Sequence, residues 1–181
     1  VRLSLDAYLD KTRIPLKIDI STGDVITPCE ISFSYQLMFE NRTIPLLAYP
    51  PETVLAEKLE TILSRGEANT RLRDFYDVYI LQREDFVVTP DALRYALLAT
   101  CRKRGHEDLL HTYASILNEV RQSGAMRAQW MKYQTDFDYA AGITWDTVLD
   151  TVETLCMKTL DDHAFGDELP QEESQFEMHL L

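Results

Sequence analysis

Alternation of apolar and polar positions marks the first 49 residues of the chain. In residues 1–9 the apolar side chains fall at every second position, and the same alternation returns over residues 14–21 and 31–39. A more continuous apolar run covers residues 43–49. Successive side chains of a strand point to opposite faces of a sheet. These four segments therefore predict a small antiparallel sheet of about four strands with one buried face.

After Pro50 and Pro51 the apolar positions change to a helical period. The pattern predicts helices at residues 52–65, 71–83, 90–104, 107–122, 124–140 and 144–160. Thr89 and Thr144 are the expected N-caps of the third and the sixth helix. The predicted fold class is α+β, a small sheet followed by a bundle of five to six helices. The predicted divisions are a sheet portion (1–49), a helical region (50–160) and an acidic tail (161–181).

The charge of the chain is acidic and unevenly placed. The 181 residues carry a formal net charge of −12, and residues 161–181 contain seven acids and no Lys or Arg. We expect this tail to be a solvated extension, with an acidic arm that covers a basic groove as the alternative. An acidic chain also argues against broad, sequence-independent nucleic-acid binding, which needs clustered cations.

Composition also narrows the location and the redox chemistry of the protein. No apolar run reaches the length of a membrane span and no secretory signal is present, so we expect a soluble, cytoplasmic protein. Cys29, Cys101 and Cys156 are far apart and odd in number. They predict neither a disulfide framework nor a thiolate metal site, and we expect them to be small, partly buried apolar residues.

A lysine interrupts the apolar stripe of the first predicted helix. Lys58 falls inside the stripe formed by Val54, Leu55, Leu59 and Ile62. An ammonium group is almost never buried unpaired, so this side chain must reach solvent, pair with an acid, or point into a cleft. The helical pattern leaves open whether Lys58 is a snorkelling surface residue or part of a functional cleft.

The second predicted helix carries a carboxylate in partly apolar surroundings. Asp74 shares a face with Val78 and Leu81, and Arg71 and Arg73 lie close to it in the sequence. As a structural residue Asp74 would cap the helix or pair with Arg71. As a functional residue it would present an acid to a site between the two helices.

Two motifs in these helices point to a known family. Residues 49–58 read YPPETVLAEK and residues 71–77 read RLRDFYD. They resemble the A-E-K and R-x-[KR]-D-[FL]-Y-D motifs of the AbiEii/AbiGii nucleotidyltransferase toxins. Residues 17–28 are similar to that family's I-D-I and G-D-x-I-x-P segment, and the region around Trp130 resembles its helical C-terminal part. The likeness covers roughly residues 1–160.

The resemblance implies a partial nucleotidyltransferase-like fold and a role for each of four residues. Lys58 would be the active-site lysine that contacts the triphosphate, and Arg71 would be a second nucleotide-binding cation. Asp74 would be the acid that completes the catalytic centre. Asp19 would be a weaker candidate for a metal ligand.

The resemblance also implies a reaction and its partners. The family transfers a nucleotide from an NTP to an acceptor, which can be tRNA in toxin members, and a cognate antitoxin is the expected protein partner. Such a transfer needs Mg²⁺ held by carboxylates and a cation on the phosphates, in agreement with these residue types. Glu57 and Asp77 flank the motif residues and are expected to be structural partners.

One motif of the family has no match in this sequence. The G-[GS]-[TS] turn followed by [DE]-x-D, which cradles phosphates and binds metal, is not found, and the chain enters a strand pattern directly at Val1. We therefore expect Mg²⁺ and an NTP to be bound by an intact form, with no tight binding and no transfer by this polypeptide alone. The alternative function is a non-catalytic interaction module, such as a pseudoenzyme that binds a protein partner.

The other polar features have simpler interpretations. The charge runs at residues 57–60 and 102–104 are expected to be exposed helix faces, with contact between 102–104 and an RNA backbone as the alternative. Trp130 and Tyr133 are expected in the core of the bundle and not as stacking platforms. The histidines are expected to be solvated at the surface: His106, His111, His163 and His179.

Overall fold

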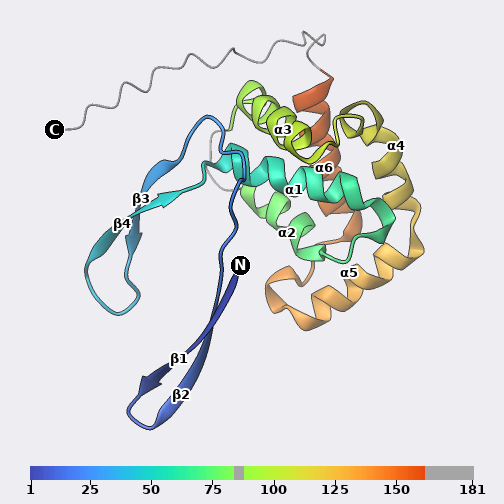
Figure 1. The fold of residues 1–181 in the computed structure, drawn as a ribbon. Helices are drawn as coiled ribbons and strands as arrows, with labels where there is room; N and C mark the ends of the chain where they lie inside the picture. The colour runs from blue at the N-terminus through green and yellow to red at the C-terminus, as the bar shows by residue number, and fades with distance from the viewer. Residues whose placement is uncertain (84–87, 162–181) are drawn as a thin grey trace, which may run out of the picture.

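A computed structural model describes residues 1–83 and 88–161 of the chain. Within these ranges, four β-strands come first and six α-helices follow, with two short 3-10 helices, η1 (Gly66–Ala68) and η2 (Asp138–Ala140) (Figure 1). The predicted α+β class is confirmed. The predicted acidic tail lies outside the described residues, apart from Asp161.

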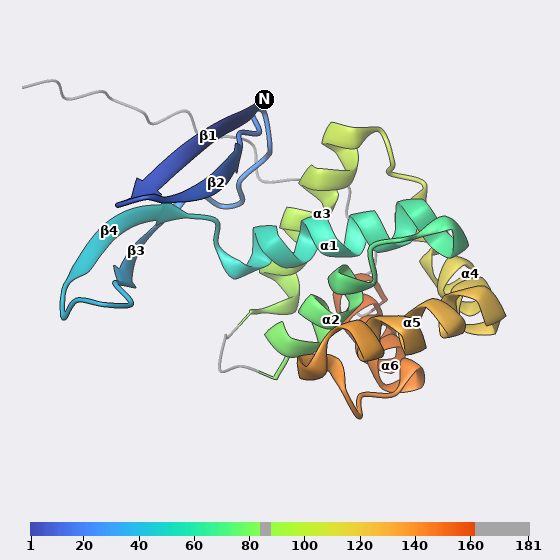
Figure 2. The same ribbon diagram turned by 90° about the horizontal axis from the view of Figure 1, so that it is seen from below.

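The four strands form two separate antiparallel hairpins: β1 (Arg2–Leu9) with β2 (Thr12–Asp19), and β3 (Ile31–Gln36) with β4 (Thr43–Ala48). Leu3 pairs with Ile18 in the first hairpin, and Phe33 pairs with Leu46 in the second. These four side chains are 43–50% exposed, so the prediction of one sheet with a buried face is wrong. In both views the hairpins stand clear of the helices (Figures 1 and 2), which explains why nothing described here covers their apolar faces.

The helices are α1 (Pro51–Arg65), α2 (Leu72–Leu81), α3 (Pro90–Arg104), α4 (Leu109–Gln122), α5 (Gly124–Asp136) and α6 (Trp145–Leu160). Both predicted N-caps are confirmed, because the Thr89 and Thr144 side chains accept hydrogen bonds from the N–H groups of Ala92 and Thr147. The predicted helix 124–140 is too long, since the extended backbone of Phe137 (φ −137°) ends α5. None of the described helices is long and apolar enough to cross a membrane.

Helix α1 lies between α2 and α3 in both views (Figures 1 and 2) and contacts α2, α3 and α4. Its buried side chains Leu55, Leu59 and Ile62 are fully enclosed in the core. The predicted core position of Trp130 is confirmed, since its indole is 1% exposed and its Nε1–H donates to the Ile143 carbonyl at 2.8 Å. The apolar stripe read from the sequence therefore packs the helix that carries Lys58 into the centre of the bundle.

A buried carboxylate ties α1 to the C-terminal end of α3. Glu60 is 2% exposed and forms an ion pair with Arg104, while its Oε1 lies 2.6 Å from His106 Nδ1. The prediction that the 57–60 run is an exposed face is therefore wrong at Glu60, whereas His106 is exposed as predicted and also contacts Glu60. A carboxylate can be buried here because two partners replace its lost hydration.

The enclosure of the core predicts the reactivity of the thiols. Burial raises the pKa of Cys101 and of Cys156 to about 12, whereas Cys29 is exposed. Since the thiolate is the nucleophile, a disulfide reagent at pH 8 should modify one thiol rapidly in the native protein and three in denaturant. Replacement Cys29→Ser should remove the rapid phase, and rapid modification of a second thiol would contradict this burial.

The Glu60 ion pair predicts that loss of the Glu60 charge destabilises the protein. Glu60→Gln removes the charge opposite Arg104 and His106, and we expect it to lower the free energy of unfolding by about 1–3 kcal/mol. Urea unfolding followed by circular dichroism measures the change. The matched control is Glu67→Gln at an exposed position, where the expected change is about 0.5 kcal/mol or less. Equal stabilities of the two variants would show that Glu60 does not hold α3 on α1.

Candidate functional site

Lys58 on α1 reaches two carboxylates of α2. Its Nζ lies 2.5 Å from Asp77 Oδ2 and 3.4 Å from Asp74 Oδ1, and its side chain is 19% exposed. The lysine is therefore paired and not simply snorkelling, because its charge is matched inside the helix interface. The structure brings together Lys58 and Asp74, which lie sixteen positions apart in the sequence.

Asp74 is the more deeply buried of the two carboxylates, with 3% of its side chain exposed. Arg71 Nε lies 2.9 Å from Oδ2, and Arg71 Nη2 donates to Oδ1 at 3.3 Å. The contact between Arg71 Nε and Asp74 Oδ2 is an ion pair that lacks the geometry of a hydrogen bond. Such misalignment matters less between two opposite charges than between a neutral donor and a neutral acceptor. The sequence left two structural roles for Asp74, capping the helix or pairing with Arg71. No side chain caps the N-terminus of α2, so Asp74 has the second role.

The turn before α2 sets the position of Arg71. Asn69 is fully buried, and its Oδ1 accepts a hydrogen bond from the Arg71 backbone N–H at 2.7 Å. This contact starts α2 at Leu72 and places Asp74 in its first turn. A carboxylate in that position is also favoured by the positive end of the helix dipole.

Asp77 was assigned a flanking role from the sequence, yet it is the nearest partner of Lys58. The signal was present in the RLRDFYD motif, because acids three positions apart share a helix face. Asp74 and Asp77 consequently meet the same ammonium group. Arg73, at 3.9 Å from Asp77, is a looser and well exposed neighbour.

A cavity of about 280 Å³ opens beside this cluster. Three cations from different segments of the chain line it: Lys58 of α1, Arg71 before α2, and Arg104 at the end of α3. Arg104 also lies 3.6 Å from Glu57. The cavity therefore combines three positive groups with carboxylates that hold them in place, an arrangement suited to a polyanion such as a triphosphate.

The segment 23–28 docks against the same end of α1. The Thr53 hydroxyl accepts a hydrogen bond from the Thr27 N–H at 2.9 Å and lies 3.1 Å from the Thr27 carbonyl. Tyr49 donates to Asp24 at 3.1 Å, and this hydrogen bond raises the pKa of the Tyr49 hydroxyl. Burial raises the pKa of Glu57 on the adjoining turn of α1. Segment 23–28 and the motif at residues 49–58 thus meet at the start of α1, and the motif at residues 71–77 contacts the same helix through Lys58.

Asp19 stands apart from this cluster. It lies at the open end of the first hairpin with a side chain 65% exposed, and Arg2 donates to both of its carboxylate oxygens at 2.6 and 2.8 Å. These hydrogen bonds lower the pKa of Asp19. Asp19 is not among the residues that line the Lys58 cavity, and its role as a metal ligand stays a prediction.

The charge run 102–104 is largely engaged within the protein. Arg104 pairs with Glu60 and Glu57, and Arg102 lies 3.8 Å from Glu107. Lys103 lines a smaller cavity of about 190 Å³ next to segment 23–28. Acids of the protein already neutralise the charge of Arg102 and Arg104. Contact between residues 102–104 and an RNA backbone stays a prediction.

Comparison with known proteins agrees with the motifs that converge here. A family model described as Nucleotidyl transferase AbiEii toxin, Type IV TA system, matches residues 1–151. No curated protein and no solved structure matches the chain. The matched range contains the 23–28 segment and the motifs at 49–58 and 71–77 in full. The chain belongs to the AbiEii nucleotidyl transferase toxin family of type IV toxin–antitoxin systems.

Proposed function

We propose that this chain supplies the nucleotide-binding and positioning groups of a nucleotidyltransferase that moves a nucleotide from an NTP to an acceptor. Membership of the AbiEii family supports this reaction type. The observation that carries the proposal is the convergence of Lys58, Arg71 and Arg104 on one cavity beside the buried Asp74. Lys58 lies on α1, Arg104 at the end of α3 and Arg71 directly before α2, and these helices pack in one core.

In the proposed reaction an acceptor hydroxyl oxygen forms a bond to the α-phosphorus of the NTP. The bond from that phosphorus to the bridging oxygen breaks, pyrophosphate leaves with the electron pair, and the hydroxyl proton passes to solvent. Negative charge grows on the leaving group, where positioned cations stabilise it. We assign Lys58 and Arg71 to the β- and γ-phosphates, with Arg104 as a third cation at the same cavity.

Asp74 and Asp77 act in this proposal by holding the cations and not by attacking the substrate. Asp74 contacts both Lys58 and Arg71, and Asp77 contacts Lys58. A side chain that is already fixed in place loses less conformational freedom when it binds a phosphate. The two acids thereby convert flexible cations into a preorganised phosphate site.

Mg²⁺ is the ion that nucleotidyl transfer ordinarily uses, and it is the metal of the proposed reaction. The acids described here do not compose such a site by themselves. Both carboxylates near Lys58 are engaged by cations, and the described residues contain no group of three or more His, Cys, Asp or Glu that could hold a metal. The roles proposed for Lys58, Arg71 and Arg104 depend on their charge alone.

The partners and location follow the family and the sequence. We propose an antitoxin as the cognate partner in the toxin–antitoxin system and a hydroxyl-bearing acceptor such as tRNA, in a cytoplasmic setting. A non-catalytic interaction module remains the second candidate function. The exposed apolar faces of the two hairpins favour it, because such faces are typical of surfaces that meet another chain.

The phosphate assignment predicts the effect of two substitutions. Weak binding of ATP and of inorganic tripolyphosphate to the full chain should be measurable by titration calorimetry. Lys58→Ala should weaken it at least tenfold, about 1.4 kcal/mol, because one of the three cations is lost. Asp74→Asn should weaken it by a smaller factor, because Lys58 and Arg71 lose a charged anchor.

Two controls separate a lost site from a lost fold. Lys17→Ala removes a charge from the exposed face of β2 and should leave tripolyphosphate binding unchanged. Thermal unfolding by circular dichroism identifies variants that remain folded, and Lys58→Gln keeps a hydrogen-bond donor toward Asp77 if Lys58→Ala unfolds. Unchanged binding in folded Lys58 and Asp74 variants would remove the transferase assignment and leave the interaction module.

A further inference from the structure

An acidic segment follows the last helix of the bundle and has no part in the function proposed above. Residues 162–181 contain six acids and no Lys or Arg. They lie beyond residues 1–151, the range that the family model matches, so family membership assigns them no role. The acids include two adjacent pairs, Asp167–Glu168 and Glu172–Glu173. Adjacent carboxylates resemble the linked charges of a polyphosphate, and both kinds of anion pair with Arg.

We propose that the segment 162–181 binds in cis across the Lys58 cavity and competes there with polyphosphate ligands. This autoinhibitory contact rests on the proposed nucleotide site and adds regulation to it. Three observations carry it: the charge of the segment, the cations that the cavity presents to solvent, and the place where the segment leaves the helical body.

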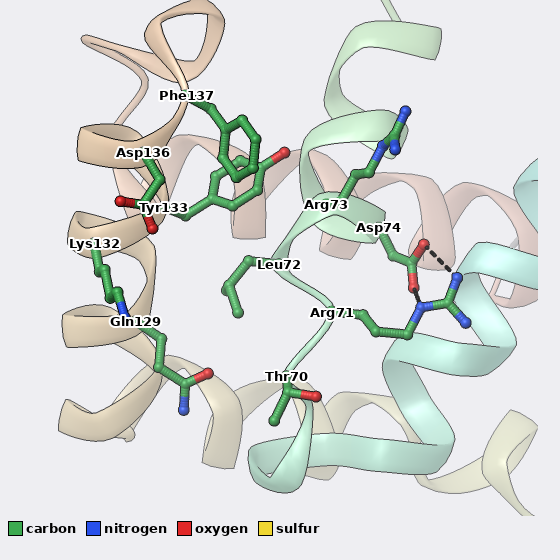
Figure 3. A pocket seen from close by; sticks show the side chains of 10 residues that line it. All are labelled: Thr70, Arg71, Leu72, Arg73, Asp74, Gln129, Lys132, Tyr133, Asp136 and Phe137. Atoms are coloured by element: carbon green, nitrogen blue, oxygen red, sulfur yellow. Dashed lines mark hydrogen bonds and ion pairs between the residues drawn. The ribbon is translucent and has the colours of Figure 1, made fainter. Parts of the chain in front are cut away.

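The cations of the Lys58 cavity are accessible to a further anion, although acids of the protein hold them. The side chains of Arg71 and Arg104 are 56% and 34% exposed. Figure 3 looks into an adjoining cavity of about 500 Å³ and shows Arg71 extending away from α5, with its guanidinium next to Asp74. Because a guanidinium carries five N–H donors, Arg71 can bind Asp74 and a second carboxylate at the same time.

The end of α6 places the start of the segment near one wall of the cavity. Tyr113 of α4 donates a hydrogen bond to Asp161 at 2.7 Å, directly before the segment. Burial raises the pKa of Cys156, and Cys101 of α3 adds to this shift, so the last turns of α6 and α3 are neighbours. Arg104, the last residue of α3, lines the Lys58 cavity. The segment therefore leaves the body beside the helix that supplies the third cation.

The segment is long enough to reach the cavity from that point. Its 20 residues can span at most roughly 66–72 Å. A compact body of about 110 residues has a radius of gyration of only about 13 Å. A segment tethered at this distance acts at an effective concentration on the order of 1 mM, so weak contacts with the cations are enough to occupy the cavity.

A cavity beside α6 itself is the nearest alternative for the segment. It measures about 460 Å³ and is lined by Arg83 and Lys158. The Arg83 guanidinium lies over the Tyr79 ring, 5.2 Å from its centroid, and donates to the Tyr79 hydroxyl at 2.7 Å. Lys158 is then the cation that this cavity offers to an acid. The Lys58 cavity offers three cations, so we assign the segment to it and use Lys158 as a control.

The decisive measurement is tripolyphosphate binding by two full-length chains at low salt, followed by titration calorimetry. One chain is unchanged, and the other has both acidic pairs neutralised: Asp167→Asn, Glu168→Gln, Glu172→Gln and Glu173→Gln. The neutralised chain should bind at least fivefold more tightly, because its own segment no longer competes.

A synthetic peptide of residues 162–181 should restore the competition when it is added to the neutralised chain. Fivefold competition at an effective concentration of about 1 mM corresponds to an inhibition constant of about 0.25 mM for the free peptide. The same peptide with the four substitutions should not compete. Labelled peptide also reports the contact without any phosphate, by anisotropy, and Arg71→Ala should weaken its binding to the neutralised chain at least threefold.

Matched controls separate docking from other effects of charge. A variant with four exposed acids of the body neutralised should gain at most twofold in tripolyphosphate affinity: Glu30→Gln, Glu67→Gln, Asp108→Asn and Glu119→Gln. In a Lys158→Ala background the fivefold difference should remain. It should also remain over a tenfold range of protein concentration, since the contact lies within one chain.

Four results would overturn the autoinhibitory contact. Equal affinities of the unchanged and the neutralised chain would remove the competition, and absence of peptide binding would remove the contact itself. An equal gain in the body variant would identify net charge as the cause, and a difference that disappears on dilution would identify contact with a second copy. The proposed function fails separately, if the neutralised chain keeps its tripolyphosphate affinity after Lys58→Ala or if neither chain binds tripolyphosphate while the peptide binds.

Discussion

The pairing of a partly buried ammonium group is the constraint on which this part of the structure depends. Lys58 lies in the apolar stripe of α1, so its charge must be matched where the helix packs. Asp74 and Asp77 match it from α2, and Arg71 then balances the surplus negative charge. Each of these contacts specifies how α1 and α2 lie against each other, and a sliding of either helix by one turn would leave a charge unmatched.

The same helix carries a second charged contact on its other side. Glu60 holds Arg104 of α3, two positions after Lys58, so α1 is bound by charge to both of its neighbours. The two contacts have opposite polarity, because α1 gives a cation to α2 and an anion to α3. Arg104 and Lys58 therefore line one cavity from different helices, because the acids paired with each cation offset the repulsion between them.

Much of this arrangement could be predicted from the sequence, and the failures have physical causes. Helix starts followed from Thr89 and Thr144, because capping is a local interaction. The meeting of Lys58 and Asp74 followed from family motifs. The burial of Glu60 could not be predicted, since its partner is forty-four positions away at the end of α3. The strands were predicted correctly but their burial was not, because alternation identifies an apolar face without naming what covers it.

The separation of the hairpins from the helices has a consequence for the motions of the protein. Each hairpin is a two-stranded ribbon bonded only to itself, and ribbons of this kind are marginally stable in water. Their amide hydrogens should exchange with solvent through local opening, while those of α1 and α6 exchange only when the whole helical body unfolds. We therefore expect two levels of cooperativity in unfolding, with the boundary between them at Thr27 and Thr53, where the strand and helix regions are joined by hydrogen bonds.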